Sequence, residues 1–286
     1  MHQELYYSNK DNSFIISQVE KTGFSSMLER HFHDNFEIYY LLSGERYYFI
    51  KDRTYHIIKG DLVFIGAYDL HKTIDAGVPG HKRIVMNFNN KFVSTLNNSI
   101  DEILNFLFKN NTNVIRLNSN EQNFVEGILN KIIYEASNKA FGYEASIQSL
   151  FTQLLVFASR HAKANINTLF EHPSHTHKKV AEIVQYINKN YMNKINLSTI
   201  SEKFFISRYH FSRIFKEATG FTFTEYINSV RIQEAQKYLR ETNWKISTIS
   251  EKAGFESIAH FGRVFKKATG LSPLNYRKKM THETAS

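Results

Sequence analysis

The chain has 286 residues, 42% of them hydrophobic, a formal net charge of +9 and no cysteine. Its length allows about two domains, and the lack of cysteine excludes disulfides and thiolate metal sites. No apolar run reaches the roughly 18 residues of a membrane-spanning helix, and the N-terminus lacks the basic start and apolar stretch of a signal peptide. We therefore expect a cytoplasmic protein without membrane contacts.

Residues 12–90 predict short strands separated by turns. Apolar and β-branched runs, which are typical of strands, stand at residues 14–16, 36–42, 46–50, 54–58, 62–65 and 84–88. Turn formers such as Gly44 and Gly60 separate these runs. Several short strands at close spacing indicate a sandwich or a small barrel.

Two histidines and a carboxylate stand just before or within the second of these strands. His31 and His33, followed by Glu37 and then by Gly44, resemble the first motif of the cupin barrel. Ser25 stands where that motif begins with glycine. Two residues apart on a strand, His31 and His33 would face the same side of the sheet.

A second motif resembles the cupin pattern less closely. Its glycine and histidine are Gly60 and His71, but Gly66, Tyr68 and Asp75 replace the usual proline, glycine and asparagine. The resemblance to cupins covers about residues 25–90. It implies a β-barrel whose interior carries the matching side chains.

The cupin resemblance leaves two roles open for these side chains. In metal-dependent cupins, the ligands are the residues that match His31, His33, Glu37 and His71. Three imidazoles and a carboxylate suit a divalent ion. In an effector pocket, the polar groups would be His31, His33, Glu37, Tyr39 and His71. Aromatic walls, expected from Tyr47, Phe49 and Phe64, would suit a sugar or a similar small polar ligand; we favour this pocket and expect no cofactor.

Beyond residue 90 the apolar spacing becomes that of helices. Apolar stripes predict helices within residues 100–108, 124–133 and 150–158. These helices either cover the barrel or form a dimer seam, and the sequence does not separate the two arrangements.

Residues 163–178 lose this periodicity, contain Pro173 and predict a linker. His172, His175 and His177 offer metal ligands there, but a solvated linker is the stronger interpretation. The predicted domains are a cupin-like barrel at 1–93, a helical segment for dimerisation at 94–162, the linker at 163–178 and a helical domain at 179–286.

One stretch of the last third occurs twice. Residues 198–203 recur letter for letter at 247–252, and residues 207–220 are echoed at 257–270. The first offset is 49 residues (247 − 198) and the second is 50 (257 − 207), so the later copy has one extra residue. Each copy predicts two short helices with the tight connection of a helix-turn-helix.

The second helix of each copy carries the functional prediction. Ser207 and Ser257 are natural N-caps for it. A helix in the major groove reads bases with its N-terminal residues and holds phosphates with basic side chains further along. The predicted DNA contacts are Ser207, Arg208, Tyr209, Ser212, Arg213, Lys216, Ser257, Ile258, His260, Arg263, Lys266 and Lys267. Arg213 and Arg263 are the strongest candidates for bidentate contact with guanine, whereas His260, like His210, is equally compatible with packing.

Charge and spacing support a polyanionic partner. Residues 178–286 hold 19 Lys and Arg against 9 Asp and Glu, a net of +10, whereas residues 1–177 hold 17 against 18, a net of −1. A near-neutral front joined to a basic back is typical of a sensor joined to a polyanion binder. Between the copies, residues 224–240 predict one long helix that could hold the two recognition helices about 34 Å apart, one turn of duplex DNA.

Residues 180–278 resemble the AraC/XylS family of bacterial transcription regulators. The matching residues are the doubled helix-turn-helix, Phe215-Lys216, Phe265-Lys266, Arg231-Ile232 with Ala235, Gly254-Phe255, and Gly270 with Pro273, Tyr276 and Arg277. The resemblance implies one polypeptide that reads two successive major-groove segments. Ser201 and Ser250 depart from the usual alanine. The second recognition helix also offers Ile258, Ala259 and Gly262, which are poor hydrogen-bonding residues.

We therefore predict an α+β multidomain fold, with an N-terminal cupin-like β-barrel, a helical dimerisation segment and a C-terminal all-α double helix-turn-helix. The predicted protein is no enzyme but a ligand-responsive transcription regulator, with activation favoured. Its partners would be double-stranded promoter DNA, a small effector of sugar type, RNA polymerase and a second copy of the chain. Two alternatives stay open: a metal-binding cupin enzyme tethered to DNA, and a regulator that needs no effector or responds to pH.

Overall fold

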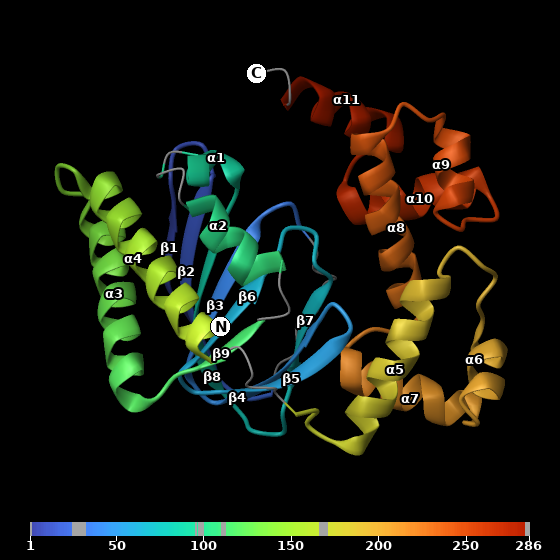
Figure 1. The fold of residues 1–286 in the computed structure, drawn as a ribbon, viewed down its shortest axis with the longest axis horizontal. Coiled ribbons are helices and arrows are strands. Elements are labelled where there is room, and N and C mark those ends of the chain that lie inside the picture. Colours follow the sequence, from blue (N-terminus) through green and yellow to red (C-terminus); the bar gives the residue numbers. More distant parts are fainter. Residues whose placement is uncertain are drawn as a thin grey trace. The chain divides into compact units, whose positions relative to one another are not determined.

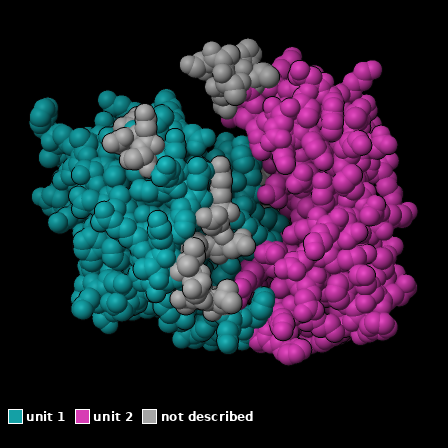
Figure 2. Space-filling view, viewed as in Figure 1, with its two compact units in different colours: residues 1–51, 55–173 teal, residues 52–54, 174–286 magenta. Residues whose placement is uncertain are grey.

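The computed structural model describes residues 2–24, 33–94, 96, 100–109, 113–165 and 171–283. The chain forms two compact units, residues 1–51 with 55–173 and residues 52–54 with 174–286 (Figure 2). From His175 onward, every element within the described residues is an α-helix. Within the same residues, no helix combines the length and the apolar character needed to cross a membrane.

Two antiparallel sheets build the first unit (Figure 1). The larger has the order β1-β2-β8-β3-β6-β9, with β1 (His2–Ser8), β2 (Phe14–Lys21), β3 (Phe36–Ser43), β6 (Asp61–Ile65), β8 (His81–Phe88) and β9 (Val114–Arg116). The smaller has the order β5-β4-β7, with β4 (Glu45–Ile50), β5 (Arg53–Ile58) and β7 (His71–Asp75). The sequence interpretation missed β1, β7 and β9. Polar residues dominate β1 and β7 and hide their pattern, and β9 has only three residues.

The larger sheet is the middle layer of the unit. Alternate side chains of its strands point to opposite faces, and each face packs in a separate core. On β3, Ile38 and Tyr40 belong to the core that includes the helices. Tyr39 and Leu41 belong instead to the core between the two sheets, which we call the barrel interior. The interior core consists of Tyr39, Leu41, Tyr48, Ile50, Tyr55, Ile57, Val63, Ile65, Val85 and Val114.

Helices α3 (Ser119–Asn138) and α4 (Tyr143–Ala164) cover the outer face of the larger sheet (Figure 1). A capping box starts α3: the Asn118 side chain accepts from the Glu121 N–H, and the Glu121 carboxylate accepts from the Asn118 N–H. The inward stripes of the two helices bury Val125, Ile128, Leu129, Ile132, Phe151, Leu154, Leu155 and Ala158. The shorter elements before them are α1 (Asn90–Ser94), α2 (Ile100–Leu104) and the π-helical turn η1 (Asn105–Lys109). The helices thus cover the barrel wall, and a dimer seam on their outer side stays a prediction.

Helical structure extends into both ends of the segment 163–178, which the sequence interpretation predicted as a linker. Helix α4 continues to Ala164, and the next helix already begins at His175. Ser174 caps that helix: its hydroxyl accepts from the N–H of His177 at 3.4 Å and hydrogen-bonds with the His177 ring at 2.8 Å. His175 and His177 therefore lie in a helical turn rather than in a linker, while residues 166–170 lie outside the described residues.

The second unit is arranged around the long helix α8. Its helices are α5 (His175–Asn190), α6 (Leu197–Lys203), α7 (Arg208–Thr219), α8 (Phe223–Glu241), α9 (Ile246–Lys252), α10 (Ile258–Thr269) and α11 (Pro273–Glu283). Thr222 and Glu225 form a capping box at the start of α8. The pair α6–α7 lies near one end of α8 and the pair α9–α10 near the other (Figure 1). The long helix that the sequence predicted between the repeats is therefore present.

Candidate nucleic-acid interface and ligand site

The first helix pair, α6 and α7, has the geometry of a helix-turn-helix. Ile200 on α6 and Phe211 on α7 are fully buried and belong to the apolar face that the repeat predicted. The Ile206 N–H donates to the Ser201 carbonyl at 3.0 Å and closes the turn. The Ser207 hydroxyl then accepts from the N–H of His210 at 3.2 Å and caps α7.

The second pair, α9 and α10, repeats this arrangement. The Phe255 N–H donates to the Ser250 carbonyl at 3.0 Å, and the Ser257 hydroxyl accepts from the N–H of His260 at 3.4 Å. The extra residue of this copy is Glu256, which stands between the turn and the cap. The repeat in the sequence is thus a repeat in three dimensions.

All the residues predicted to contact DNA are exposed on the second helices of the two pairs. On α7 and its cap these are Ser207, Arg208, Tyr209, Ser212, Arg213 and Lys216. On α10 and its cap they are Ser257, Ile258, His260, Arg263, Lys266 and Lys267. The hydroxyls of both serines are used as helix caps. His210 and His260 are exposed as well, although the His260 ring lies edge-on to the Phe255 ring with centroids 5.7 Å apart.

The two exposed faces differ in charge at one equivalent position. On α7, Arg213 Nη1 lies 3.2 Å from Glu217 Oε1, and its other terminal nitrogen lies 3.4 Å from the His210 ring. On α10, Lys267 stands where α7 has Glu217. The α10 face therefore has no carboxylate one helical turn beyond Arg263, and it is the more positive of the two.

Arg231 has a structural role that the family resemblance did not supply. Its Nε donates to the Tyr191 carbonyl at 2.9 Å and its Nη2 to the Asn193 carbonyl at 3.0 Å. The guanidinium also lies over the Phe255 ring, 5.8 Å from its centroid. Arg231 thus joins the end of α5, helix α8 and the turn of the second pair.

In the barrel interior, His33, Glu37 and His71 come together. His33 Nε2 lies 3.4 Å and His71 Nε2 lies 4.0 Å from Glu37 Oε2, and the Tyr48 hydroxyl donates to Glu37 Oε1 at 2.8 Å. One potential ligand atom of each of these His and Glu residues lies within 4.8 Å of the others. The sequence interpretation missed Tyr48, and His31 lies outside the described residues.

The buried carboxylate of Glu37 is held ionised by its neighbours. Burial alone would raise the pKa of Glu37, but the hydrogen bond with His33 and the adjacent His71 and His33 imidazoles outweigh burial and lower that pKa to about 2. Burial lowers the pKa of His33, but the hydrogen bond and charge of Glu37 raise it above its ordinary value. A charged acceptor beside two imidazoles can bind hydroxyl groups or a divalent cation.

The aromatic residues around Glu37 in the barrel interior differ from those that the sequence predicted. Tyr39 is fully buried, and its ring lies edge-on to Tyr48 with centroids 5.3 Å apart. Tyr47 and Phe49 alternate with Tyr48 on β4 and therefore point away from the interior, and Phe64 packs on the helical side of the larger sheet. The interior tyrosines are Tyr39, Tyr48 and Tyr55. The expectation of walls formed by Tyr47, Phe49 and Phe64 was wrong, because a strand sends adjacent residues to opposite faces.

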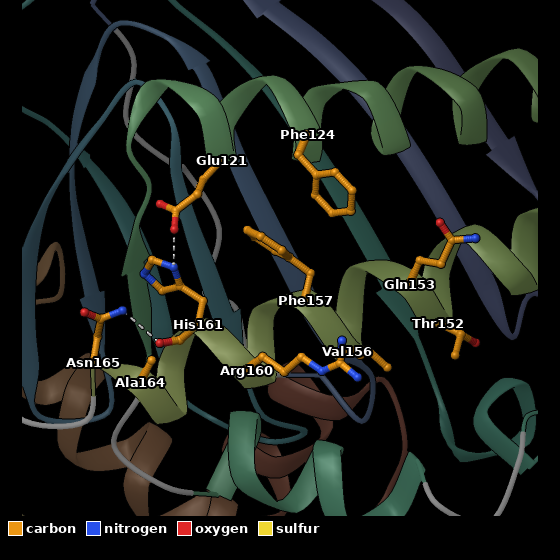
Figure 3. A pocket seen from close by; sticks show the side chains of 10 residues that line it. All are labelled: Glu121, Phe124, Thr152, Gln153, Val156, Phe157, Arg160, His161, Ala164 and Asn165. Atoms are coloured by element: carbon orange, nitrogen blue, oxygen red, sulfur yellow. Dashed lines mark hydrogen bonds and ion pairs between the residues drawn. The ribbon is translucent and has the colours of Figure 1, made fainter.

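A pocket of about 460 Å³ lies on the outer side of α3 and α4 (Figure 3). Its lining residues are Glu121, Phe124, Thr152, Gln153, Val156, Phe157, Arg160, His161, Ala164 and Asn165. The Phe124 and Phe157 rings lie 5.0 Å apart between centroids. At one side, His161 Nδ1 lies 2.9 Å from Glu121 Oε1. The pocket combines an apolar centre with a charged rim.

Comparison with known families gives one match in each of the two units of the chain. Residues 24–155 match the family model of the AraC-like ligand binding domain, and residues 200–279 match that of a helix-turn-helix domain.

Three curated relatives cover different parts of the chain. The HTH-type transcriptional activator RhaS of Mannheimia succiniciproducens is 24% identical over 250 residues, which are 87% of this chain and 88% of RhaS. The multiple antibiotic resistance protein MarA of Salmonella typhimurium is 32% identical over 103 residues, 36% of this chain and 81% of MarA. The bifunctional transcriptional activator/DNA repair enzyme AdaA of Bacillus subtilis is 38% identical over 96 residues, 34% of this chain and 46% of AdaA. This chain therefore spans less than half of AdaA.

The duplicated helix-turn-helix, the sheet domain before it and these matches lead to one assignment. The chain belongs to the AraC family of transcription regulators, with an AraC-like ligand binding domain followed by a helix-turn-helix DNA-binding domain.

Proposed function

We propose that this chain is a ligand-responsive activator of transcription that binds promoter DNA with α7 and α10. The observation that carries the proposal is the presence of two exposed basic helices in one unit, each with the same turn and the same serine cap. The major groove of a duplex returns once in each turn, so two similar helices suit two successive groove segments. We therefore take double-stranded DNA as the partner.

The length of α8 supports this mode of binding. Its 19 residues correspond to about 28 Å at about 1.5 Å per residue, close to the roughly 34 Å repeat of the duplex. On α7, Arg213 binds guanine. Arg263 has the equivalent place on α10, but its neighbours Ile258, Ala259 and Gly262 are poor hydrogen-bonding residues. On α10, therefore, Ile258 contacts thymine methyl groups, and Arg263 holds a phosphate rather than a guanine, as do the neighbouring lysines.

The N-terminal unit is the sensing part of the proposal. A small polar effector of sugar type binds in the barrel interior at His33, Glu37, Tyr39 and His71, and its differential affinity for two states changes how α7 and α10 meet DNA. The chain acts as a homodimer in the cytoplasm, and as an activator it also contacts RNA polymerase. We propose no catalytic activity, because RhaS, which matches 87% of this chain, is named as a transcriptional activator, and less than half of AdaA is matched.

A second candidate rests on the His33, Glu37 and His71 cluster, whose ligand atoms are close enough for one divalent ion. In this version the chain is a metal-binding cupin. Metal analysis of full-length protein purified without chelator separates the candidates. About one equivalent of metal, lost in His33→Ala, would favour the cupin; a metal-free protein that binds DNA favours the regulator.

The DNA-binding proposal is tested with full-length protein and a random duplex library. Selection yields the preferred site, and fluorescence anisotropy then gives the affinity at several salt concentrations. We expect the logarithm of the association constant to fall linearly with the logarithm of salt concentration. Lys266→Gln and Lys267→Gln should each reduce that slope by about 0.9, because each removes one phosphate contact.

Lys59→Gln is the matched control, since it removes an exposed lysine from the N-terminal unit and should leave the slope unchanged. No enriched sequence, or a slope that Lys266→Gln and Lys59→Gln change equally, would contradict the proposal.

A further inference from the structure

The barrel interior carries positive charge at the end opposite Glu37. On β8, Val85 lies in the interior core, so Arg83 and His81, two and four residues before it, face the same way. The strand register places Lys21 of β2 opposite His81. Directly opposed residues share a face, so Lys21 also points inward.

The smaller sheet adds a further guanidinium to this end. Arg46 stands two residues before the interior Tyr48 on β4 and opposite Asp75 on β7. Its Nη1 lies 3.6 Å from Asp75 Oδ2, a longer separation than that of a bidentate ion pair. We call Lys21, Arg46, His81 and Arg83 the cationic end of the interior.

This charge is largely removed from water. The Arg46 side chain is 2% exposed and His81 is 4% exposed, whereas Lys21 and Arg83 are half-buried. Among the described residues, three permanent cations thus stand here with Asp75 as the carboxylate that acts on them. Buried charge of one sign is costly unless a counter-ion joins it.

The four groups lie within electrostatic reach of one another. Burial, followed by the charges of Arg46, Arg83 and Lys21, lowers the pKa of His81 to about 4 against the opposing effect of Asp75. Burial, Arg83 and Arg46 also lower the pKa of Lys21.

A flat aromatic surface adjoins the cationic end. The Arg83 guanidinium carbon lies 5.6 Å from the centroid of the Tyr39 ring. Tyr39 stands between Arg83 and the Glu37 end, and its other neighbour is the Tyr48 ring. Charge and aromatic surface therefore meet in one place.

We propose that the cationic end binds the anionic group of a small organic effector, a carboxylate or a phosphate, with the body of the effector against Tyr39. This inference rests on the effector-sensing part of the proposed function and specifies the chemistry of the effector. Guanidinium groups present forked donors that match carboxylate and phosphate oxygens. A neutral sugar would leave the excess positive charge uncompensated, so an acidic or phosphorylated sugar fits the site better.

Hydrogen–deuterium exchange of the full-length chain without DNA tests the site directly. The probes are inorganic phosphate, D-glucuronate and D-glucose 6-phosphate, each compared with D-glucose at constant ionic strength. At ten times its dissociation constant, a bound anion slows exchange through unfolding about tenfold. We expect at least one anion to slow exchange in β8 and β4, and glucose to leave it unchanged. Whether glucuronate or the two phosphates protect more strongly tells a carboxylate site from a phosphate site. No protection by any of the anions would overturn the inference.

Arg83→Gln and Lys82→Gln form a matched pair for this test. Lys82 is the neighbouring residue on β8, faces the other side and pairs with Glu20 at 3.8 Å. Protection should disappear in Arg83→Gln and persist in Lys82→Gln. Without anion, Arg83→Gln should also be at least as stable as wild type, because it removes one of several like charges. A less stable Arg83→Gln that still shows anion protection would instead assign Arg83 a structural role and refute the site.

The two proposals can fail separately. Hydrogen–deuterium exchange in β8 is measured without DNA. If no anion slows it, the ligand site is refuted, but the expected salt dependence of DNA binding is unaffected. Anion protection without any DNA binding would keep the ligand site and remove the proposed regulator.

Discussion

Arg213 and Arg263 occupy equivalent places on α7 and α10 but have different neighbours. Glu217 pairs with Arg213 at 3.2 Å, whereas Lys267 stands at the equivalent place after Arg263. An exposed pair of this spacing contributes about 0.3–0.5 kcal/mol, and a bidentate contact with guanine about 1–3 kcal/mol. The ion pair can therefore orient Arg213 in the free protein and still yield to a base.

We expect Arg213→Ala to weaken binding to the preferred duplex by about 1–3 kcal/mol and to relax the choice of base at one position. Arg263→Ala should weaken binding less and equally for all sequences, because a phosphate contact carries no base preference. A gel-shift titration of both variants, with Lys59→Ala as the surface control, measures the difference. The reverse order of the two effects would refute the assignment of base reading to α7.

His81 leads to a prediction about pH. Its ordinary pKa of 6.5 falls to about 4 in the folded chain through burial and through Arg46, Arg83 and Lys21, against Asp75. Folded His81 is thus neutral while unfolded His81 takes up a proton, so its contribution to stability is complete above pH 6.5 and is lost as the pH falls toward 4. We expect the urea midpoint, followed by near-ultraviolet circular dichroism of the tyrosines, to fall more between pH 7 and pH 5 in wild type than in His81→Gln. Equal losses would contradict this account.

At the scale of elements, the two turns solve one backbone problem differently. Phe205 and Gly254 hold equivalent places, and both have a positive φ, 52° and 85°. Phe205 is 93% exposed, so its ring buries almost nothing in return. A Cβ on Gly254 would lie 2.6 Å from the Tyr191 carbonyl oxygen and 2.9 Å from the Met192 Cα. The second turn requires glycine, because a side chain there would clash with the backbone. The first turn has room for a side chain and carries Phe205 at a positive φ.

We expect Phe205→Gly to raise the free energy of unfolding of the second unit by up to about 1 kcal/mol, since it relieves the left-handed backbone. Gly254→Ala should lower that free energy by about 2 kcal/mol or more, because it adds a backbone clash to an unfavourable φ. Gly262→Ala is the control: apart from its chain neighbours and the backbone of its own helix, no atom of the described residues lies within 4 Å of its added Cβ, and alanine in a helix is favoured by about 1 kcal/mol. Urea unfolding followed by Trp244 fluorescence measures all three, and a destabilised Phe205→Gly would contradict the strain argument.

At the scale of the whole molecule, the prediction concerns association of two copies through α3 and α4. Phe124 is 49% exposed in the apolar centre of the pocket and packs on Phe157. If α3 and α4 form the dimer interface, Phe124→Glu buries a charge in it. We therefore expect the dissociation constant of the dimer, measured by sedimentation velocity, to rise at least tenfold, which corresponds to about 1.4 kcal/mol. Asn123→Glu adds the same charge at an exposed site one residue earlier and should leave the dimer intact. Unchanged association of Phe124→Glu would place the seam elsewhere.

Much of the DNA-binding unit could be predicted from local pattern. The 3.6-residue period assigned Phe211 to the core and Arg213 to the surface, and a serine before each second helix marked the start of that helix. The helices of the first unit were also visible as apolar stripes. Strand β7 was missed, because a buried strand that carries His71, Lys72 and Asp75 has no apolar alternation to read.

The sequence alone determined the family, the double helix-turn-helix and the exposed cations, because these depend on residues a few positions apart along one helix. Only the tertiary structure decided which side chains share the barrel interior. Glu37 meets His71, and Arg83 joins Arg46, through strands that are far apart in the chain, while Tyr48 reaches Glu37 from the next strand. Register between strands and the packing of one sheet on the other create these neighbours, and neither leaves a local mark in the sequence.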